Sequence, residues 1–245
     1  HRRPRRLRTP EDVGAGGRLL LSAAMFVGHF GVGFGAKAAA PRASLGTLVL
    51  ASQFIDLLWP TLLLFGLETV EIRPGITRVT PLDFTSYPIS HGLLAVVVWG
   101  LLFAGVYQVA RRYAAGAVAM FAAVVSHWLL DLVTHRPDLP LWPGSDAKVG
   151  LGLWDSLPGT LAVELAVFAA GVALYLRTTR ANDRTGVFAL WGLVAFLLLV
   201  YAANLFGSVP PGVTAIAWAG QAQWLLVAWA YWVDRHRSLR APAAA

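Results

Sequence analysis

The chain has 245 residues, of which 57% are hydrophobic and only 13% are charged, and its mean hydropathy is +0.60. This composition excludes an ordinary soluble domain, in which about 25% of residues are charged. It also excludes a disordered chain, which needs low hydrophobicity. Because cysteine is absent, disulfide frameworks and thiolate metal sites are excluded as well. The sequence therefore predicts an all-α, polytopic integral membrane protein.

Six apolar runs are long enough to cross about 30 Å of hydrocarbon. They lie at about 44–67, 89–110, 114–135, 158–177, 186–206 and 212–233. A seventh run at 25–40 is short and rich in glycine, and it either spans with help from its neighbours or enters only part-way. We therefore predict a bundle of six to seven transmembrane helices. It forms one domain over 25–235, and a short cytoplasmic tail follows at 236–245.

The loops between these spans carry unequal charge. One set holds ten basic residues and the alternate set only four, mixed with acidic residues. The positive-inside rule places the first set in the cytoplasm. The net charge of +7 then reflects topology, so we expect the lipid bilayer as partner and no nucleic acid.

The N-terminal segment 1–24 strains this topology, because it holds six arginines on the external side if 25–40 spans. Either the first helix does not span, or the segment is an extension upstream of Met25. We favour the extension. A signal peptide is a weaker interpretation, since only Ser22-Ala23-Ala24 resembles a cleavage site.

Ionisable residues inside the predicted spans mark candidate functional positions. With the orientation set by Lys and Arg, all of them fall in the outer half of the membrane, which favours one site on the extracytoplasmic side. They are His29, Asp56, His91, His127, Asp131, His135 and Glu164.

The fourth predicted span carries the sharpest pattern. His127 and Asp131 are four residues apart on one helical face, a spacing that lets both reach one metal ion. His135 is eight residues from His127, about 12 Å along a helix, so a proton-transfer role or a second ion suits it better. Asp138 follows in a proline-rich loop at the mouth of the site. The plainer alternative for His127 and Asp131 is a buried hydrogen-bonded pair.

Four segments together resemble the predicted membrane-bound, inner-membrane metal-dependent hydrolases of bacteria. They are GHFGVGFGAK with His29, FIDLLWP with Asp56, YPISHGLL with His91, and SHWLLDLVTHRPDLPLWPG at 126–144. The helical His and Asp ligands are also remotely similar to those of zinc-dependent phospholipase C and P1-type nucleases. The chain departs from the family's fuller motif at Phe54, Leu57 and Ser86, where further ligands are expected. A site with one or two metal ions follows from these departures.

The leading hypothesis is a metal-dependent hydrolase that acts on a phosphoester or lipid-like substrate near the outer leaflet. His29, Asp56, His91, His127 and Asp131 would bind Zn²⁺, or Mn²⁺ or Fe²⁺, while His135, Asp138 and Glu164 are the candidate catalytic acids and bases. Two alternatives stay open. One is a proton or metal-ion transporter, and the other is a degenerate family member with a structural role.

Overall fold

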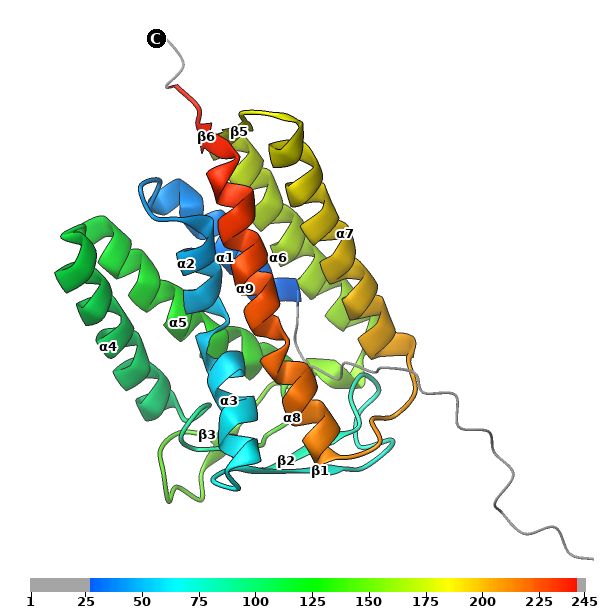
Figure 1. Cartoon of the computed structure of the whole chain (residues 1–245). Coiled ribbons are helices and arrows are strands. Elements are labelled where there is room, and N and C mark those ends of the chain that lie inside the picture. Colours follow the sequence, from blue (N-terminus) through cyan, green and yellow to red (C-terminus); the bar gives the residue numbers. More distant parts are fainter. Residues whose placement is uncertain (1–26, 242–245) are drawn as a thin grey trace, which may run out of the picture.

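The computed structural model describes residues 27–241, so the predicted extension at 1–24 lies outside the described residues. Figure 1 shows that the described chain is mostly helical, with three small two-stranded antiparallel sheets at its ends. The helices are α1 (Val27–Ala39), α2 (Leu45–Ser52), α3 (Phe54–Leu64), α4 (Leu93–Arg111), α5 (Ala114–Thr134), α6 (Leu157–Thr178), α7 (Arg184–Phe206), α8 (Val213–Gln221) and α9 (Gln223–Arg235). The strand pairs are β1 (Thr69–Ile72) with β2 (Leu82–Ser86), β3 (Leu139–Pro140) with β4 (Lys148–Val149), and β5 (Thr179–Ala181) with β6 (Arg237–Leu239).

Four helices in the described chain are long and apolar enough to cross a membrane, namely α4, α5, α6 and α7. They match four of the predicted spans within a few residues. The predicted span at 44–67 is bent by 55° between α2 and α3, and counting this pair as one span gives five. The structure thus gives four to five candidate spans where six to seven were expected.

The remaining two predicted spans are shorter or divided. With 13 residues, α1 is about 20 Å long, less than the roughly 30 Å of hydrocarbon that a full span must cross. The run at 212–233 divides at Ala222 into α8 and α9. The division at Gln53 is sharper, because Gln53 leaves the helical conformation at φ −100° and ψ 1°, whereas Ala222 keeps it at φ −62° and ψ −16°. A continuous apolar run therefore does not ensure a continuous helix.

Helix α1 lies in the interior of the bundle and packs most extensively on α6. Glycine permits this contact, since a Cβ added at Gly31 would lie 2.7 Å from both the Cα of Phe168 and the carbonyl oxygen of Val167. Small residues at such crossings let helix backbones approach closely in lipid. The approach holds the first turn of α1, with His29, inside the protein.

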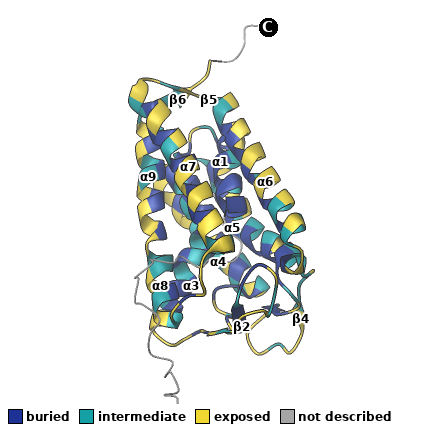
Figure 2. Cartoon of the chain, turned by 90° about the vertical axis from the view of Figure 1, so that its right-hand side faces the viewer, coloured by how far each residue is buried: buried dark blue, intermediate teal, exposed yellow. Residues whose placement is uncertain are grey.

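The outward faces of the long helices are apolar. Figure 2 shows exposed residues along the outside of the bundle, and on α4 they include Val106 and Val109, which are 70% and 82% exposed. Water would disfavour such a surface, whereas lipid tails match it. These faces are suited to contact with the bilayer.

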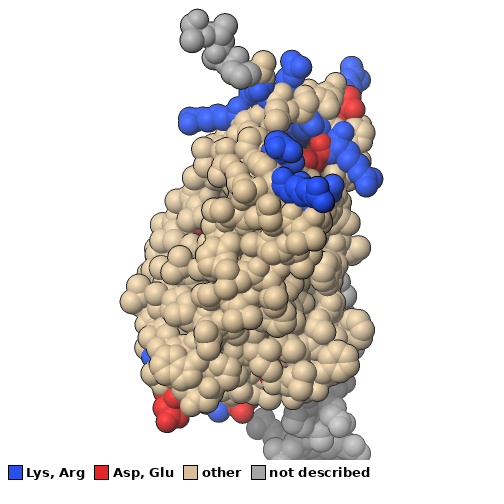
Figure 3. Space-filling model, turned by 90° about the vertical axis from the view of Figure 1, so that its left-hand side faces the viewer, with Lys and Arg blue, Asp and Glu red and all other residues tan. Residues whose placement is uncertain are grey.

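The two ends of the bundle differ in charge. In Figure 3, Lys and Arg gather at the end that carries β5 and β6. Hairpins β1–β2 and β3–β4 form the opposite end (Figures 1 and 2). Lys37, which lies in the apolar run at 25–40, is buried in the last turn of α1, where its Nζ lies 3.0 Å from Asp234. The distribution matches the charge asymmetry of the sequence.

Candidate metal centre

Five ionisable side chains converge between four segments that are far apart in the sequence. His127 and Asp131 lie on the buried face of α5, His29 in the first turn of α1, and Asp56 in the first turn of α3, whereas His91 precedes α4. The histidines and Asp131 are at most 3% exposed. The sequence predicted all five residues as ligands, and the structure brings them together.

The donor atoms form two overlapping groups that share His127. His29, Asp56 and His127 make one, and His91, His127 and Asp131 make the other. Within each group, the potential ligand atoms all lie within 4.8 Å of one another. Each group could hold a metal ion, and the shared histidine joins the two groups.

Individual distances support the same geometry. The Nε2 atom of His127 lies 3.5 Å from Oδ1 of Asp56 and 3.4 Å from Oδ2 of Asp131. The Nε2 atom of His91 lies 3.6 Å from Asp56 and 3.8 Å from Asp131. Two ligands about 2.1 Å from one tetrahedral ion are about 3.4 Å apart. The observed separations are therefore close to those of side chains that share one cation.

Two imidazoles lie parallel in this cluster. The rings of His29 and His127 stack with centroids 3.7 Å apart and planes at 5°, and Nε2 of His29 lies 3.2 Å from Oδ1 of Asp131. Protonating both rings would place two positive charges in contact. Neutral imidazoles, the form that binds metal, avoid that repulsion.

Several buried polar atoms in the cluster have no hydrogen-bond partner among the described residues. They are both ring nitrogens of His29, Nε2 of His127 and Oδ2 of Asp131. Leaving such atoms unpaired in a buried site is costly. A cation among them would offset this cost, and imidazole with carboxylate ligands is a donor set that Zn²⁺, Mn²⁺ and Fe²⁺ accept.

A break in the helix α2–α3 orients His127. Its Nδ1 lies 3.0 Å from the carbonyl oxygen of Ser52, the last residue of α2. A carbonyl can only accept, so Nδ1 carries the hydrogen and Nε2 is left to face the carboxylates. Helix ends leave carbonyls without helical partners, and the bend at Gln53 supplies one here.

His135 and Asp138 form a second cluster beside the five residues. Nδ1 of His135 lies 2.9 Å from Oδ1 of Asp138, and the hydroxyl of Tyr87 donates to the same oxygen at 2.9 Å. The ring of Tyr87 lies between the two clusters, 5.2 Å from the ring of His91 and 6.0 Å from that of His135. Neither His135 nor Asp138 belongs to the two ligand groups.

Asp138 is held by three donors. Arg136 Nε donates to its second oxygen at 3.0 Å, and Arg136 also pairs with Asp83. Burial raises the pKa of Asp138, but the hydrogen bonds from His135 and Tyr87 outweigh it and hold this pKa below its ordinary value. The carboxylate is thus kept ionised beside His135, where it orients the imidazole.

Glu164 occupies a different place from the other predicted catalytic residues. Its Oε2 accepts hydrogen bonds from the backbone N–H groups of Val27 at 3.1 Å and Gly28 at 3.5 Å. These are among the first N–H groups of α1, which have no partner within the helix. The structure gives Glu164 a capping position at the two residues that directly precede His29.

The three positions that depart from the family motif have different surroundings in the structure. Phe54 packs against the rings of Trp99 and Phe103, Leu57 is buried in the apolar core, and Ser86 is exposed at the end of β2. None of the three offers a strong metal ligand. The candidate ligands are therefore the five residues described above.

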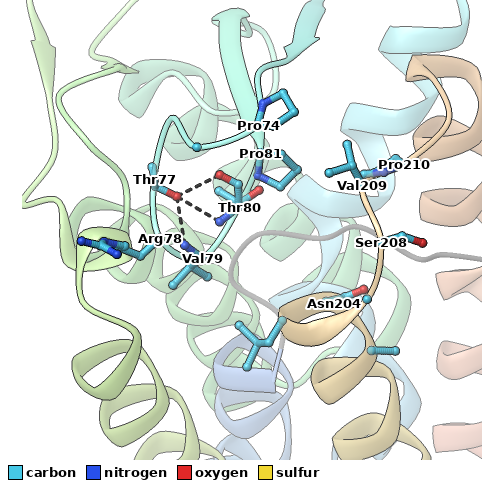
Figure 4. A pocket seen from close by; sticks show the side chains of 14 residues that line it. Pro74, Thr77, Arg78, Val79, Thr80, Pro81, Asn204, Ser208, Val209 and Pro210 are labelled. Carbon is cyan, nitrogen blue, oxygen red and sulfur yellow. Dashed lines mark hydrogen bonds between the residues drawn. The ribbon is translucent and has the colours of Figure 1, made fainter. Parts of the chain in front are cut away.

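A shallow pocket lies outside this centre, between the 74–81 turn and the end of α7 (Figure 4). It is bounded by a turn in which Thr77 Oγ1 accepts from the backbone N–H groups of Val79 and Thr80, and its far side includes Asn204 and Ser208. Its lining includes none of the eight predicted site residues. This pocket and the candidate metal ligands thus lie at different places.

Sequence reasoning missed three residues that contact the predicted site, namely Ser52, Tyr87 and Ser90, and also Glu68, which reaches it through Ser90. Two signals pointed to them. Glu68 directly follows the predicted span at 44–67 and is one of the acidic residues in the less basic set of loops. Tyr87 and Ser90 belong to the same short segment as His91, and Ser90 directly precedes it.

Comparison with known proteins gives one match. A family model described as YdjM inner membrane protein matches residues 25–208, more than half of the chain. No curated protein and no solved structure matches. The family's description names no reaction, so the hydrolase activity stays a prediction. Together with the long apolar helices, the match indicates a multi-pass protein of the inner membrane. The chain belongs to the YdjM inner membrane protein family.

Proposed function

We propose that this protein is a membrane-embedded metal-dependent hydrolase that acts on a phosphoester or lipid-like substrate at the outer leaflet. One observation carries the proposal. The Nε2 atoms of His127 and His91 face the carboxylates of Asp56 and Asp131 at 3.4–3.8 Å in a buried site. Carboxylates facing imidazole lone pairs repel unless a proton or a metal cation lies between them, and the stacked rings of His29 and His127 disfavour protonating both.

Zn²⁺ is the proposed ion, with Mn²⁺ and Fe²⁺ as alternatives of the same ligand chemistry. His29, His91 and His127 would hold it through nitrogen, and Asp56 and Asp131 through oxygen. Such an ion supplies an activated water with a pKa near 7 and polarises the scissile bond.

The chain's own residues account for access and proton transfer. The side chain of Asp56 is 16% exposed, whereas those of the three histidines and Asp131 are at most 4% exposed, so substrate would enter beside Asp56. His135, oriented by Asp138, is the proposed proton acceptor, and Tyr87 links it to the cluster. Glu164 is proposed to act through α1, by holding the turn that presents His29.

The charge asymmetry supports the proposed orientation. The basic end of the bundle would face the cytoplasm, and the end with β1–β2 and β3–β4 would face outward. The five residues then lie toward the outer leaflet, where headgroup phosphoesters are within reach. In this topology α8 and α9 would cross together as a sixth span, and α1 would enter part-way.

Metal analysis of the detergent-purified protein tests the proposal. We expect about one transition-metal ion per chain in the wild type and a loss of that ion in His91→Ala and Asp131→Ala. His236→Ala is the matched control, since His236 pairs with Asp183 at the basic end. Hydrolysis of a bis-aryl phosphodiester and of phospholipid vesicles, with and without a chelator, then tests the reaction.

Two outcomes would contradict the proposal. A wild type that binds no transition metal when dialysed against Zn²⁺, Mn²⁺ and Fe²⁺ would remove its basis. Metal or proton flux in proteoliposomes, without hydrolysis of either substrate, would favour the transporter instead.

A further inference from the structure

Glu68 is a buried carboxylate with an unusual set of partners. It lies between α3 and β1 and is 2% exposed. Its Oε1 accepts from the backbone N–H groups of Ile89 at 2.7 Å and Ser90 at 2.8 Å, and its Oε2 accepts from the Ser90 hydroxyl at 2.5 Å. Three donors thus fix this carboxylate against the segment that leads to His91.

The direction of these hydrogen bonds determines the tautomer of His91. The Oγ atom of Ser90 also lies 2.7 Å from Nδ1 of His91. Because the one hydroxyl hydrogen goes to Glu68, Ser90 can only accept from the ring, so Nδ1 carries the hydrogen. The lone pair of His91 is then on Nε2, the atom that faces Asp56 and Asp131.

His91 and His127 therefore both carry the hydrogen on Nδ1, but they donate it to different acceptors. His127 donates to the neutral carbonyl of Ser52, whereas the chain from His91 ends in the carboxylate of Glu68. A carboxylate behind a histidine fixes its ring and makes its free nitrogen a stronger donor toward a cation. The difference gives His91 the stronger electrostatic support of the two.

The backbone around His91 keeps this chain of contacts short. The N–H of His91 bonds to the carbonyl oxygen of Tyr87 at 3.0 Å, which closes a turn. A Cβ added at Gly92 would lie 2.5 Å from the carbonyl oxygen of Pro88, so only glycine fits directly after His91. The turn thereby keeps the Ser90 hydroxyl in contact with both Glu68 and the His91 ring.

We propose that Glu68, acting through Ser90, is a positioning residue that fixes the Nε2-donor tautomer of His91 and strengthens cation binding at the centre. The inference rests on the proposed function for the identity of what is bound. The tautomer itself does not depend on that function. Glu68 contacts no ligand group directly, so its effect passes through the Ser90 hydroxyl.

Three substitutions separate this role from general stability. Glu68→Gln removes the charge and keeps the size, Ser90→Ala removes the relay, and Ser90→Thr restores a hydroxyl. Outer partners of metal-binding histidines typically change metal affinity by about 10–100-fold. We expect that loss for Glu68→Gln and Ser90→Ala, and near wild-type affinity for Ser90→Thr. Glu71→Gln is the control, because Glu71 is an exposed carboxylate of the neighbouring strand.

The affinity is measured by Zn²⁺ competition with a chromophoric chelator, using variants whose helical content and melting temperature match the wild type. Binding of Co²⁺ gives a second readout, since a shift in its visible absorption reports a change in the ligand field. Unchanged affinity and absorption in both Ser90→Ala and Glu68→Gln, with a wild type that binds metal, would overturn the positioning role alone.

A measurement on metal-free protein tests the tautomer of His91 even if the wild type binds no metal. In metal-free protein labelled with ¹⁵N-histidine, the ring shifts of His91 should report hydrogen on Nδ1 in the wild type and in Ser90→Thr. Ser90→Ala should shift the population toward hydrogen on Nε2. If the wild type binds no metal, the proposed function fails, while these shifts still decide the tautomer. Hydrogen on Nε2 in the wild type would overturn the inference.

Discussion

The Nδ1 atom of His127 donates to the carbonyl oxygen of Ser52, 75 residues earlier in the chain, over 3.0 Å. The two residues meet because α2 ends at Ser52 and the chain bends by 55° before α3 continues. In an unbroken helix that carbonyl would accept a backbone N–H four residues later. The irregularity in a membrane helix is thus what orients the central histidine of the cluster.

His127→Asn should separate the two functions of this imidazole. Asparagine keeps a side-chain N–H near the position of Nδ1, so the bond to Ser52 is retained while the Nε2 donor is lost. We expect metal content to fall to background and the melting temperature of the metal-free protein to change little. His127→Ala should lose both, with a further cost of about 1–3 kcal/mol for the unpaired carbonyl. Equal metal-free stability of the two variants would argue against the Ser52 contact.

Metal should stabilise the folded protein through the carboxylates of the cluster. Zn²⁺ at 100 times its dissociation constant should raise the free energy of unfolding by about 2.7 kcal/mol, because it binds only the folded state. In Asp131→Asn this increase should largely disappear, since Oδ2 of Asp131 faces the shared His127. Thermal unfolding in detergent, with Zn²⁺ or with a chelator, measures the difference. Asp183→Asn, at the opposite end, serves as the control.

Replacing Gly31 of α1 with alanine should perturb the helix packing, whereas replacing Gly35 should not. A Cβ at Gly31 would lie 2.7 Å from the backbone of α6, whereas one at Gly35 would lie at least 3.5 Å from its neighbours. Gly31→Ala should therefore cost about 1–3 kcal/mol and weaken metal binding by moving His29. Gly35→Ala should be neutral or slightly stabilising, because alanine favours helix by about 1 kcal/mol. A reversed order in unfolding and Zn²⁺ titrations would contradict the packing described here.

Much of the fold was predictable, because long apolar runs have few alternatives in lipid. Helices α4 to α7 follow directly from that constraint. The divisions at Gln53 and Ala222 were not predictable, since neither residue disfavours helix strongly and the apolar pattern runs through both. The hairpins at the ends of the bundle were also missed, because short strands between spans have no period long enough to detect.

The candidate site was predictable where ionisable residues occur within apolar sequence, because such residues are rare there. His29, His91 and His127 stood out because imidazoles are rare in apolar helices. Their partners Glu68 and Ser90 did not, since a loop carboxylate and a serine are ordinary at a span end. Their importance depends on a turn at residues 87–91 that brings Ser90 against both Glu68 and His91. Such a contact is a product of the tertiary structure.

Glu164 is expected to affect the site through the start of α1. Glu164→Ala removes the acceptor for the N–H groups of Val27 and Gly28 and should cost about 1 kcal/mol or more. Hydrogen exchange of the first turn of α1 should speed up, and Zn²⁺ affinity should fall because His29 lies in that turn. Glu164→Gln keeps an acceptor oxygen and should lose less. An unchanged exchange rate combined with a complete loss of hydrolysis would instead support a catalytic carboxylate.

The pair of Asp183 and His236 at the basic end should make stability depend on pH. The hydrogen bond from His236, followed by that from the backbone N–H of Gly186, holds the pKa of Asp183 below its ordinary value. A lowered pKa means that the ionised carboxylate stabilises the fold above about pH 4, its unfolded pKa, and that this contribution is lost as the pH falls through the folded pKa. Asp183→Asn should thus melt below the wild type at pH 5–7. The gap should begin to narrow below about pH 4 and close as the pH falls through the folded pKa, because the folded wild-type carboxyl is then neutral as well. Scans at constant ionic strength from pH 7 to 3 measure it, and a gap that stays constant over that range would assign the effect to the cap on α7 and not to the charge.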